Sequence, residues 1–578
     1  MVKWKQRPVH NHYTEGTLAK TKVLPDLLQK VLLSRGIEDH FVDQVLNPKL
    51  TFLKDPFSLH DMDKAVQRLI QAYHQKEKIC IYADFDLDGT SGLAILIDAF
   101  KKMGFQDVIY YQPKRLSEGY GFHPHAVEEL HHLGVSLIVT VDVGITSFAA
   151  FEKANELNIQ VILTDHHLPI KENDQEILPK AFALINPNHH RCQSGLGYLC
   201  GAGVAFYLVR ALRKAFSEDA NQPIPQNWDL KLLLDLFCIG TLTDMVPLID
   251  DNRVLVKHGM VVLEKTERPG LKFLLERLDL TGRQLTSQDV SIRFAPKLNA
   301  LSRMESDVLP IHIYLEESHV RAKSLVDKIL ENNQTRQNLQ SSSEEMALQK
   351  LNNWTYKDFV FVSSEHFHRG IIGLIATKLA NDFNRPAFVG SINSEGMVVG
   401  SSRLPSGFEG NLVEALKYSE NELTRFGGHA AAAGFELPFK NEARFIANLE
   451  QYFADLKNNP KELEIEFDSV AQISEINSVL MKWHDHLGPY GVGFQIPLFR
   501  FNNLQLHSYK ELKGGHLKLS FMENNQKMDA LFFSPSEYKK KLIQKDMNYD
   551  VLGELQMNYF NKSKTIQILV KDFKKNEA

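Results

Sequence analysis

Short, nearly continuous apolar runs alternate with amphipathic segments over the first third of the chain. The apolar runs cover 78–84, 107–112, 136–142, 159–165 and 181–186. The segments between them, such as 91–103 and 146–157, have helical spacing of apolar residues. Apolar strands that alternate with helices are typical of a parallel sheet covered on both faces. The pattern therefore predicts an α/β domain.

The rest of the chain divides into further blocks. Helical spacing covers 20–75 and 200–275, and a long helix is predicted from about 315 to 351. The middle of that helix is polar all round, as expected where a helix bridges two domains. A second α/β block follows to about 455, and short alternating runs then predict a small antiparallel barrel. The predicted boundaries give domains 1–315, 353–458 and 459–578, with 316–352 as the connecting helix.

Composition and charge change this picture only slightly. The 578 residues are too many for one core, and 43% hydrophobic with 24% charged residues is ordinary for a globular protein. The four cysteines lack CxxC spacing, so we expect reduced thiols and no zinc site. No apolar run reaches about 18 residues and no signal-peptide pattern opens the chain, which predicts a cytoplasmic protein without a membrane span.

The net charge of −5 argues mildly against nucleic acid as a partner. Binding depends on local charge, however, and the segment from Leu504 to the end has 13 Lys and Arg against 9 Asp and Glu, a net of +4. The predicted barrel is therefore basic on an acidic chain. A solvated lysine face would give the same count.

Three of the apolar runs end in aspartate, at Asp84, Asp142 and Asp165. Ligands bind just beyond the carboxyl ends of the strands of an open parallel sheet, so these carboxylates can converge. The first run continues into Asp86 and Asp88, and alternate residues of an extended loop share a face. A calcium-binding EF-hand loop also begins D-x-D-x-D-G. It requires glutamate where this chain has an isoleucine, and a helix where this chain has an apolar strand.

Two adjacent histidines, His166 and His167, follow the fourth run, and Asp244 lies in a later motif. Each is weak evidence alone, because a His-His pair is often only a polar turn. Together they give several carboxylates and two imidazoles with no thiolate, a set that suits Mn²⁺ or Mg²⁺. So many acidic ligands exceed what one ion needs. They favour two ions roughly 3.5–4 Å apart, as in phosphoester hydrolysis.

The motifs, in order, resemble those of a known superfamily. DFDLDG (84–89), TVDVGITS (140–147), TDHH (164–167) and GTLTDMVPL (240–248) resemble the four motifs of the DHH phosphoesterases. Further matches narrow the resemblance to the bacterial RecJ exonucleases. They are PKRLSEGYGFHP (113–124), INPN (185–188), LCGAGVAFYL (199–208), RFAPKLNALSRM (293–304), FHRGIIGLIATKLA (367–380), GSSR (400–403) and FGGHAAAAGF (426–435). The resemblance covers about residues 24–573.

The resemblance implies roles for these residues. The implied metal ligands are Asp86, Asp88, Asp142, His166 and Asp244, with Asp84 beside them as a further ligand or a support, and with Asp142 as the bridge between two Mn²⁺ or Mg²⁺ ions. His167, Asp165 and Arg303 are implied as catalytic residues, with His167 facing the scissile phosphate. The chain departs from the family pattern at Val143 and at Leu301–Ser302, where asparagine and Ala-Gly are usual.

The resemblance also implies a fold and an activity. The expected fold is a DHH catalytic domain, a long helix, a DHHA1-like domain and a C-terminal OB-fold that binds DNA. The expected activity is 5′→3′ hydrolysis of single-stranded DNA to nucleoside 5′-monophosphates, in repair and recombination. By resemblance the partners include a single-stranded-DNA-binding protein and a RecQ-like helicase, and the enzyme is expected to be a monomer.

Several residues are candidates for binding phosphate. Glycine-rich turns and helix N-termini offer free backbone N–H groups, and arginine binds oxyanions with two hydrogen bonds. The candidates are Arg115, Ser401, Arg403, His368, Gly427, Gly428 and His429, together with Arg303. For each arginine, pairing with a surface carboxylate is the alternative.

Two other functions fit parts of the sequence. One is a DHH phosphodiesterase that acts on short RNA or cyclic dinucleotides, which would not need a long chain and a barrel. The other is a non-catalytic scaffold that binds single-stranded DNA, which would not need the full set of acidic residues and histidines. The aromatic residues of the predicted barrel, such as Phe499 and Phe533, can be either core residues or base-stacking residues.

Overall fold

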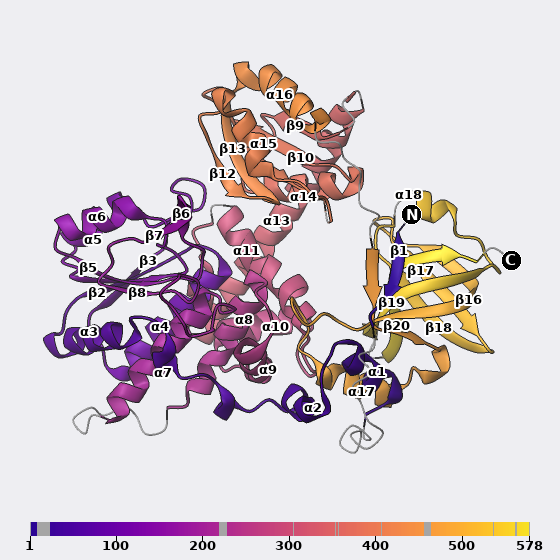
Figure 1. Cartoon of the computed structure of the whole chain (residues 1–578), viewed down its shortest axis with the longest axis horizontal. Helices are drawn as coiled ribbons and strands as arrows, with labels where there is room; N and C mark the ends of the chain where they lie inside the picture. Colours follow the sequence, from indigo (N-terminus) through magenta and orange to yellow (C-terminus); the bar gives the residue numbers. More distant parts are fainter. Residues whose placement is uncertain are drawn as a thin grey trace. The chain divides into compact units, whose positions relative to one another are not determined.

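The computed structural model describes residues 2–8, 24–218, 228–304, 306–352, 354–355, 358–405, 407–455, 464–535, 537–560 and 563–576. The chain forms two compact units. The C-terminal unit consists of Met1–Lys49, Asn459–Tyr490 and Phe494–Ala578, and the core unit of Leu50–Asn458 with Gly491–Gly493. Figure 1 labels many of the helices and strands of both units.

A five-stranded parallel sheet forms the first half of the core unit, as predicted. Its strand order is β3-β2-β4-β5-β8, and every pair is parallel. The strands are β2 (Ile79–Ala83), β3 (Val108–Tyr111), β4 (Leu137–Val141), β5 (Gln160–Thr164) and β8 (Ala183–Ile185). A small hairpin, β6 (Ile170–Glu172) and β7 (Gln175–Ile177), lies between β5 and β8 in sequence.

Helices cover both faces of this sheet. Ile79 and Ile81 of β2 lie in one hydrophobic cluster with α3, α4 and α7, whereas Cys80 and Tyr82 lie in another with α5 and α6. Strands buried on both faces explain the continuous apolar runs of the sequence. The helices of this half are α3 (Met62–Gln75), α4 (Leu87–Met103), α5 (Pro124–His132), α6 (Phe148–Glu156), α7 (Gly201–Glu218), α8 (Leu234–Asp244), α9 (Asp250–Glu264), α10 (Pro269–Arg277), α11 (Ala295–Arg303) and α12 (Pro310–Leu315).

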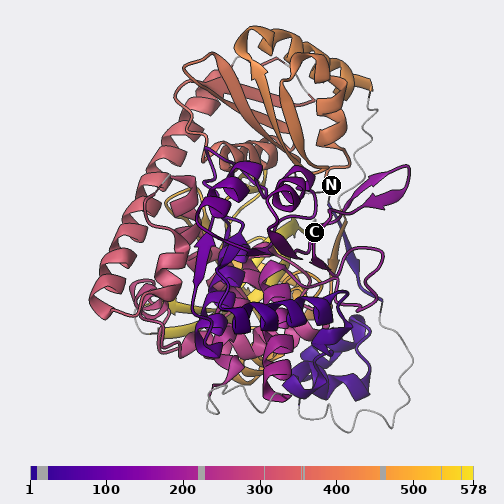
Figure 2. The ribbon, with the colours of Figure 1, turned by 90° about the vertical axis from the view of Figure 1, so that its left-hand side faces the viewer.

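A single long helix, α13 (His319–Leu351), leads from the parallel sheet to the second α/β domain. Figure 2 shows it as one continuous helix. The second domain has the strand order β12-β13-β11-β10-β9, in which only β9 and β10 are parallel. Its elements are β9 (Val360–Ser364), α14 (Ile372–Phe383), β10 (Ala387–Ile392), β11 (Met397–Arg403), α15 (Leu412–Tyr418), β12 (Arg425–His429), β13 (Ala432–Pro438) and α16 (Glu442–Asp455).

The C-terminal unit contains the predicted barrel. Pairing of β16 with both β17 and β19 closes the ring β16-β17-β18-β20-β19. The ring is not wholly antiparallel, because β18 and β20 run parallel. The elements are β14 (Glu464–Phe467), β15 (Ser469–Ala471), α17 (Ser478–Leu487), β16 (Leu498–Glu511), β17 (Leu517–Glu523), β18 (Gln526–Phe532), α18 (Glu537–Lys541), β19 (Asn548–Phe560) and β20 (Ser563–Lys575).

The N-terminal residues differ from the predicted division, which placed them with the parallel sheet. The strand β1 (Lys3–Gln6) pairs with β14, and α1 (Asp26–Ser34) packs its apolar face into the barrel core. Arg35 follows α1 and donates two hydrogen bonds, of 2.8 and 2.9 Å, to the buried carboxylate of Asp468. The next helix is α2 (Asp39–Leu46). An amphipathic pattern predicts that a helix has an apolar face but does not say which core that face covers.

Among the described residues, no helix combines the length and apolar character that a membrane span requires.

Candidate active site

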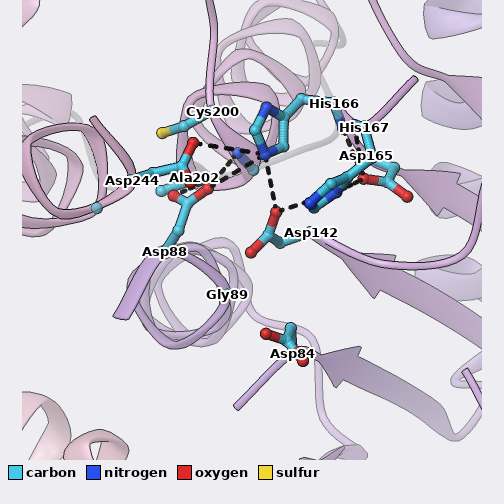
Figure 3. A network of polar contacts seen from close by, with 12 residues as sticks. Asp84, Asp88, Gly89, Asp142, Asp165, His166, His167, Cys200, Ala202 and Asp244 are labelled. Atoms are coloured by element: carbon cyan, nitrogen blue, oxygen red, sulfur yellow. Dashed lines mark hydrogen bonds and ion pairs between the residues drawn. The ribbon is translucent and has the colours of Figure 1, made fainter. Parts of the chain in front are cut away.

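The ends of three neighbouring strands bring the predicted carboxylates to one edge of the parallel sheet. Asp84 follows β2, Asp142 follows β4 and Asp165 follows β5, in the strand order β2-β4-β5. All three are buried, with at most 3% of their surface exposed. Asp142 has a φ of 62°, so the backbone turns sharply where β4 ends. Figure 3 shows how the side chains around Asp142 lie.

The loop after β2 places two more acids beside Asp84. Asp86 caps α4, because its carboxylate accepts hydrogen bonds from the backbone N–H groups of Asp88 (2.8 Å) and Gly89 (3.0 Å). A side chain at Gly89 would lie 2.6 Å from the carbonyl oxygen of Asp84, so this turn requires glycine. Asp88 then lies in the first turn of α4.

The N-terminus of α7 holds Asp88. The backbone N–H groups of Gly201 (2.6 Å) and Ala202 (2.9 Å) each donate to one carboxylate oxygen of Asp88, and the thiol of Cys200 is a third donor. A side chain at Gly201 would lie 2.3 Å from Cβ of Asp142. The glycine-containing start of α7 therefore fixes Asp88 and leaves room for Asp142.

His166 faces three of the carboxylates, and Asp244 reaches the same place from the end of α8. The Nε2 atom of His166 lies 3.1 Å from Asp142, 3.6 Å from Asp244 and 3.9 Å from Asp88. Three groups of side chains have ligand atoms close enough to share an ion. They are Asp84, Asp86 and Asp142; Asp88, His166 and Asp244; and Asp142, His166 and His167. Asp142 and His166 each belong to two of the groups, and the two side chains lie 3.1 Å apart, so the groups adjoin one another.

The carboxylates repel one another in this small volume. Burial and the charge of Asp86 raise the pKa of Asp84 to about 8 and that of Asp244 to about 6. Burial and neighbouring aspartates raise the pKa values of Asp88 and Asp142 well above their usual range. These raised pKa values mean that the positive charge near the carboxylates is too small to stabilise all of them in their ionised form.

Three polar side-chain atoms of the cluster are buried. Asp84 Oδ1, Asp142 Oδ1 and His166 Nε2 have no hydrogen-bond partner within the described parts of the chain. Burial and the charge of His167 lower the pKa of His166 to about 4, so its ring is neutral, as a metal ligand must be. Oxygen-rich ligands with imidazole suit Mn²⁺ or Mg²⁺. The residues therefore fit two such ions.

His167 differs from His166. Its Nδ1 atom lies 2.8 Å from Asp165, whose carboxylate also accepts from the backbone N–H groups of Ile145, His166 and His167. Burial opposes charge on both groups, but their hydrogen bond and attraction raise the pKa of His167 to about 9 and hold that of Asp165 at about 2. Asp165 thus orients a positively charged imidazole.

Four further residues contact the site although the sequence analysis does not identify them as site residues. The hydroxyl of Tyr120 lies 3.2 Å from Nδ1 of His167 and donates to the carbonyl of Asp142 at 3.4 Å. Gln112 donates to the carbonyl of Asp84. Asn186 and Asn188 hold the carbonyls of His167 and His166. Tyr120, Asn186 and Asn188 lie in motifs noted in the sequence, but nothing in a motif tells which member reaches the site.

The predicted phosphate-binding arginines form a second group. The guanidinium of Arg115 lies over the ring of Phe85, which stands between Asp84 and Asp86 in the sequence. The charges of these two aspartates raise the pKa of Arg115, whereas its burial lowers it. Arg303, at the end of α11, donates to the carbonyl of Gly370 at 3.2 Å. Burial and the charges of Arg115, Arg336 and Arg403 lower the pKa of Arg303 to about 10. Arg303 therefore lies with the arginines and not among the acids.

Most of the other predicted phosphate contacts share one face of the second sheet. The register aligns Ser401 with Gly434 and Gly427, and Arg403 with Ala432 and His429. A side chain at Gly427 would meet nothing within 4 Å, so the space above this row is open.

The remaining predicted residues lie around that face. Gly428 has a φ of 139° and belongs to the opposite face of β12. The glycines were predicted in a turn but lie in a strand at the sheet edge, because β12 pairs with β13. His368 precedes α14 and accepts a hydrogen bond from the N–H of Gly370. Gly373, in the first turn of α14, lies against Arg403 and Ser401.

Comparison with known protein families and relatives identifies the family to which these domains belong. The DHH family, N-terminal domain, matches residues 78–241; the DHHA1 domain matches 357–455; and the RecJ OB domain matches 467–572. The single-stranded-DNA-specific exonuclease RecJ of Bacillus subtilis is 30% identical over 99% of this chain and 70% of its own length. The RecJ exonuclease of Escherichia coli is 33% identical over 82% of this chain and 83% of its own. This chain belongs to the RecJ family.

Solved structures of the RecJ family agree with the fold. RecJ of Thermus thermophilus in complex with Mn²⁺ matches 100% of this chain and 80% of its own with a TM-score of 0.81 at 26% identity. An exonuclease RecJ bound to manganese matches 70% of this chain and 96% of its own, with a TM-score of 0.59 and 31% identity.

One departure from the RecJ pattern has a structural explanation. Val143, where the family usually has asparagine, is fully buried in the hydrophobic cluster with Ile145 and Leu163. Its side chain therefore points into the core behind Asp142 and not into the metal site.

Proposed function

We propose that this protein is a single-stranded-DNA-specific exonuclease that works in the 5′→3′ direction and releases nucleoside 5′-monophosphates, in DNA repair and recombination. The observation that carries the proposal is the convergence of five carboxylates and His166 at one sheet edge, beside a separate arginine group. Membership of the RecJ family supports the choice of single-stranded DNA as substrate.

In this proposal two divalent cations, Mn²⁺ or Mg²⁺, bind at the acidic cluster. Asp84, Asp86 and Asp142 would hold one ion, and Asp88, His166 and Asp244 would hold the other. Asp142, which lies 3.1 Å from His166 of the second set, would be the ligand shared by both. Bound cations of this kind activate water and offset negative charge on a phosphate under attack. The chain's own contribution is the fixed position of each carboxylate, given by the cap of α4 and the start of α7.

His167 is proposed to face the scissile phosphate. Its Nδ1 atom is engaged by Asp165, which leaves Nε2 to donate a hydrogen bond to a phosphoryl oxygen. The raised pKa of about 9 keeps the ring positively charged at neutral pH, which favours an anion and disfavours a metal. Asp165 and Tyr120 act through His167 by holding its ring.

The arginine group is proposed to bind the phosphate at the 5′ end of the strand. The charge of Arg115 lowers the pKa values of both Arg303 and Arg403, and the charge of Arg403 lowers that of Arg303. Arg303 and Arg403 donate hydrogen bonds to neutral oxygens. Ser401, His368, Gly427, Gly428 and His429 surround the same part of the second domain. A terminal phosphate held there would set which bond reaches the metals.

The barrel is proposed to bind the strand downstream. Phe499, Phe501 and Phe521 are buried in its core, whereas Tyr509, Phe533 and Tyr559 are 41–53% exposed. Exposed rings on a basic surface can stack bases and track phosphates. A single-stranded-DNA-binding protein and a RecQ-like helicase are proposed as partners, and the enzyme is proposed to act as a monomer in the cytoplasm.

The test is digestion of a 3′-labelled single-stranded oligonucleotide with Mn²⁺, with product analysis by mass spectrometry. The expected products are nucleoside 5′-monophosphates, with no cleavage in EDTA and little on a blunt duplex. Hydrolysis of cyclic dinucleotides in preference to the oligonucleotide would favour the small-substrate alternative. Tight binding without any cleavage in Mn²⁺ or Mg²⁺ would favour a scaffold.

A further inference from the structure

The segment that leads into α14 of the second domain contacts the end of α11 at Gly370. Arg303, the last residue of α11, donates from Nη1 to the carbonyl oxygen of Gly370 at 3.2 Å. A Cβ atom at Gly370 would lie 1.9 Å from the carbonyl oxygen of Arg303 and 3.2 Å from its Cα atom. Gly370 is not among the glycines with a positive φ, so glycine is required here for space and not for backbone conformation. The two backbones are therefore closer than a residue with a side chain would allow.

A second glycine, three residues further on, contacts another part of the arginine group. Gly373 lies in the first turn of α14, and a Cβ atom there would lie 3.1 Å from Nη2 of Arg403 and 3.3 Å from Oγ of Ser401. Nη1 of Arg403 also donates to Oγ of Ser401 at 2.9 Å. Residues 370–373 thus contact Arg303 at one end and Arg403 at the other, and we call them the spacer.

The spacer is held in one conformation. The N–H of Ile371 donates to the carbonyl of His368 at 3.0 Å, and the N–H of Gly370 donates to Nδ1 of His368 at 3.1 Å. The side chains of Ile371 and Ile372 are buried in the hydrophobic core of the second domain. The spacer therefore cannot yield without disturbing the core on which it lies.

The arginine group is divided between the two domains of the core unit, because Arg303 ends α11 and Arg403 ends β11. We propose that Gly370 and Gly373 are positioning residues, which set the separation of Arg303 from Arg403 and so the place of a bound 5′-phosphate relative to the acidic cluster. This inference rests on the proposed exonuclease function and deepens it. A phosphate that is bound by two arginines needs both at the right distance, and a misplacement of about 1 Å can lower a rate by up to about 10²-fold.

The two glycines differ in how far their neighbours can move. Ordinary contact of a Cβ atom begins at 3.4 Å, so Gly370→Ala has to move the carbonyl oxygen of Arg303 and residue 370 apart by about 1.5 Å. At Gly373 the neighbours are the ends of two side chains, which can yield by a few tenths of an ångström. Gly370→Ala should therefore have a large effect, and Gly373→Ala a smaller one in the same direction.

The test uses the full-length protein and one 3′-labelled single-stranded oligonucleotide that carries either a 5′-phosphate or a 5′-hydroxyl. We would measure kcat/KM for the first cleavage with Mn²⁺, and Kd by fluorescence anisotropy in EDTA, where no cleavage is expected. The ratio between the two ends is the decisive quantity. A variant that only loses folded protein would lower kcat/KM for both ends alike and leave the ratio unchanged.

The wild type is expected to prefer the 5′-phosphate by at least about tenfold in kcat/KM, because hydrogen bonds to a charged group are strong. Gly370→Ala should reduce the preference to about one in kcat/KM and in Kd, with kcat/KM for the 5′-hydroxyl end within about threefold of wild type. Gly373→Ala should reduce the preference by about threefold. Asn381→Ala, at an exposed position of α14, is the control and should keep the wild-type preference.

A folded Gly370→Ala protein that keeps the wild-type preference would overturn the inference. If Gly370→Ala does not fold, Gly373→Ala decides, and an unchanged preference in that variant overturns the inference as well. A wild type that cleaves both ends equally fast would overturn the terminal-phosphate role of the arginine group and the inference with it. Failure of the wild type to shorten either oligonucleotide would instead overturn the proposed function, so the failures are distinguishable.

Discussion

Replacing Asp84 with asparagine should stabilise the metal-free protein. Asp84 is 3% exposed, and burial and the charge of Asp86 raise its pKa from 3.8 to about 8. A carboxyl whose folded-state pKa is raised stabilises the fold below its unfolded pKa. That stability is lost as the pH rises from about 4 to about 8. Because pH 7 lies about 3 pH units above the unfolded pKa of 3.8, the stability lost at pH 7 is roughly 4 kcal/mol, at 1.36 kcal/mol per unit.

The assay is urea unfolding followed by fluorescence, with EDTA or with Mn²⁺, between pH 5 and pH 8. In EDTA at pH 7, Asp84→Asn should raise the free energy of unfolding by up to about 4 kcal/mol and flatten its pH dependence. In Mn²⁺ the gain should shrink or reverse, because the variant loses a ligand. The control is Asp107→Asn, an exposed aspartate near β3, which should change little.

The reasoning fails if Asp84→Asn lowers stability in EDTA, or if its pH dependence equals that of the wild type. Either result would mean that the clustered carboxylates do not oppose folding without metal. An equal gain in EDTA and in Mn²⁺ would mean that Asp84 does not bind the ion.

Three other predictions address the site and the barrel. Asp142→Ala should abolish cleavage while circular dichroism stays near wild type and the melting temperature in EDTA does not fall, and normal turnover by the folded variant would contradict the two-metal site. His167→Ala should lower kcat by roughly 10²–10⁴-fold with little change in Mn²⁺ affinity by calorimetry, whereas His166→Ala should lose that affinity; the opposite pattern would reverse the two roles. A protein of residues 50–458 should bind long single strands far more weakly than the full chain but still hydrolyse a very short oligonucleotide. Full-chain binding should weaken as salt rises, and equal loss on short and long substrates would count against a DNA-binding barrel.

The acids at the strand ends could be predicted from the rule that ligands bind at the carboxyl ends of parallel strands. Asp84, Asp142 and Asp165 each end an apolar run, and parallel strands bring their carboxyl ends to one edge. The glycine-rich motif suggests a turn with free backbone N–H groups at Gly427 and Gly428, but pairing with β13 places both residues in β12, because pairing across the sheet overrides a local preference. The direction of β20 was also missed, since alternation alone cannot distinguish parallel from antiparallel pairing.

The arginine group shows a different limit of the sequence. Arg115, Arg303 and Arg403 lie in family motifs, which makes them candidates, whereas Arg336 lies in the polar middle of α13, where no motif marks it. A helix that is polar all round gives no periodicity from which to assign faces. Which of its charges meets α11 follows only from how the two helices pack.

The enclosure of α1 and β1 within the C-terminal unit has a consequence for synthesis on the ribosome. Both β1 and α1 are translated before the core unit, but their partners on β14 and in the barrel are translated after it. The 409 residues of 50–458 come between, which at typical bacterial speeds takes roughly 20–80 s. Throughout that time Leu27, Leu28 and Val31 lack the core that buries them. A chain that terminates early would keep this apolar helix face open to chaperones and proteases.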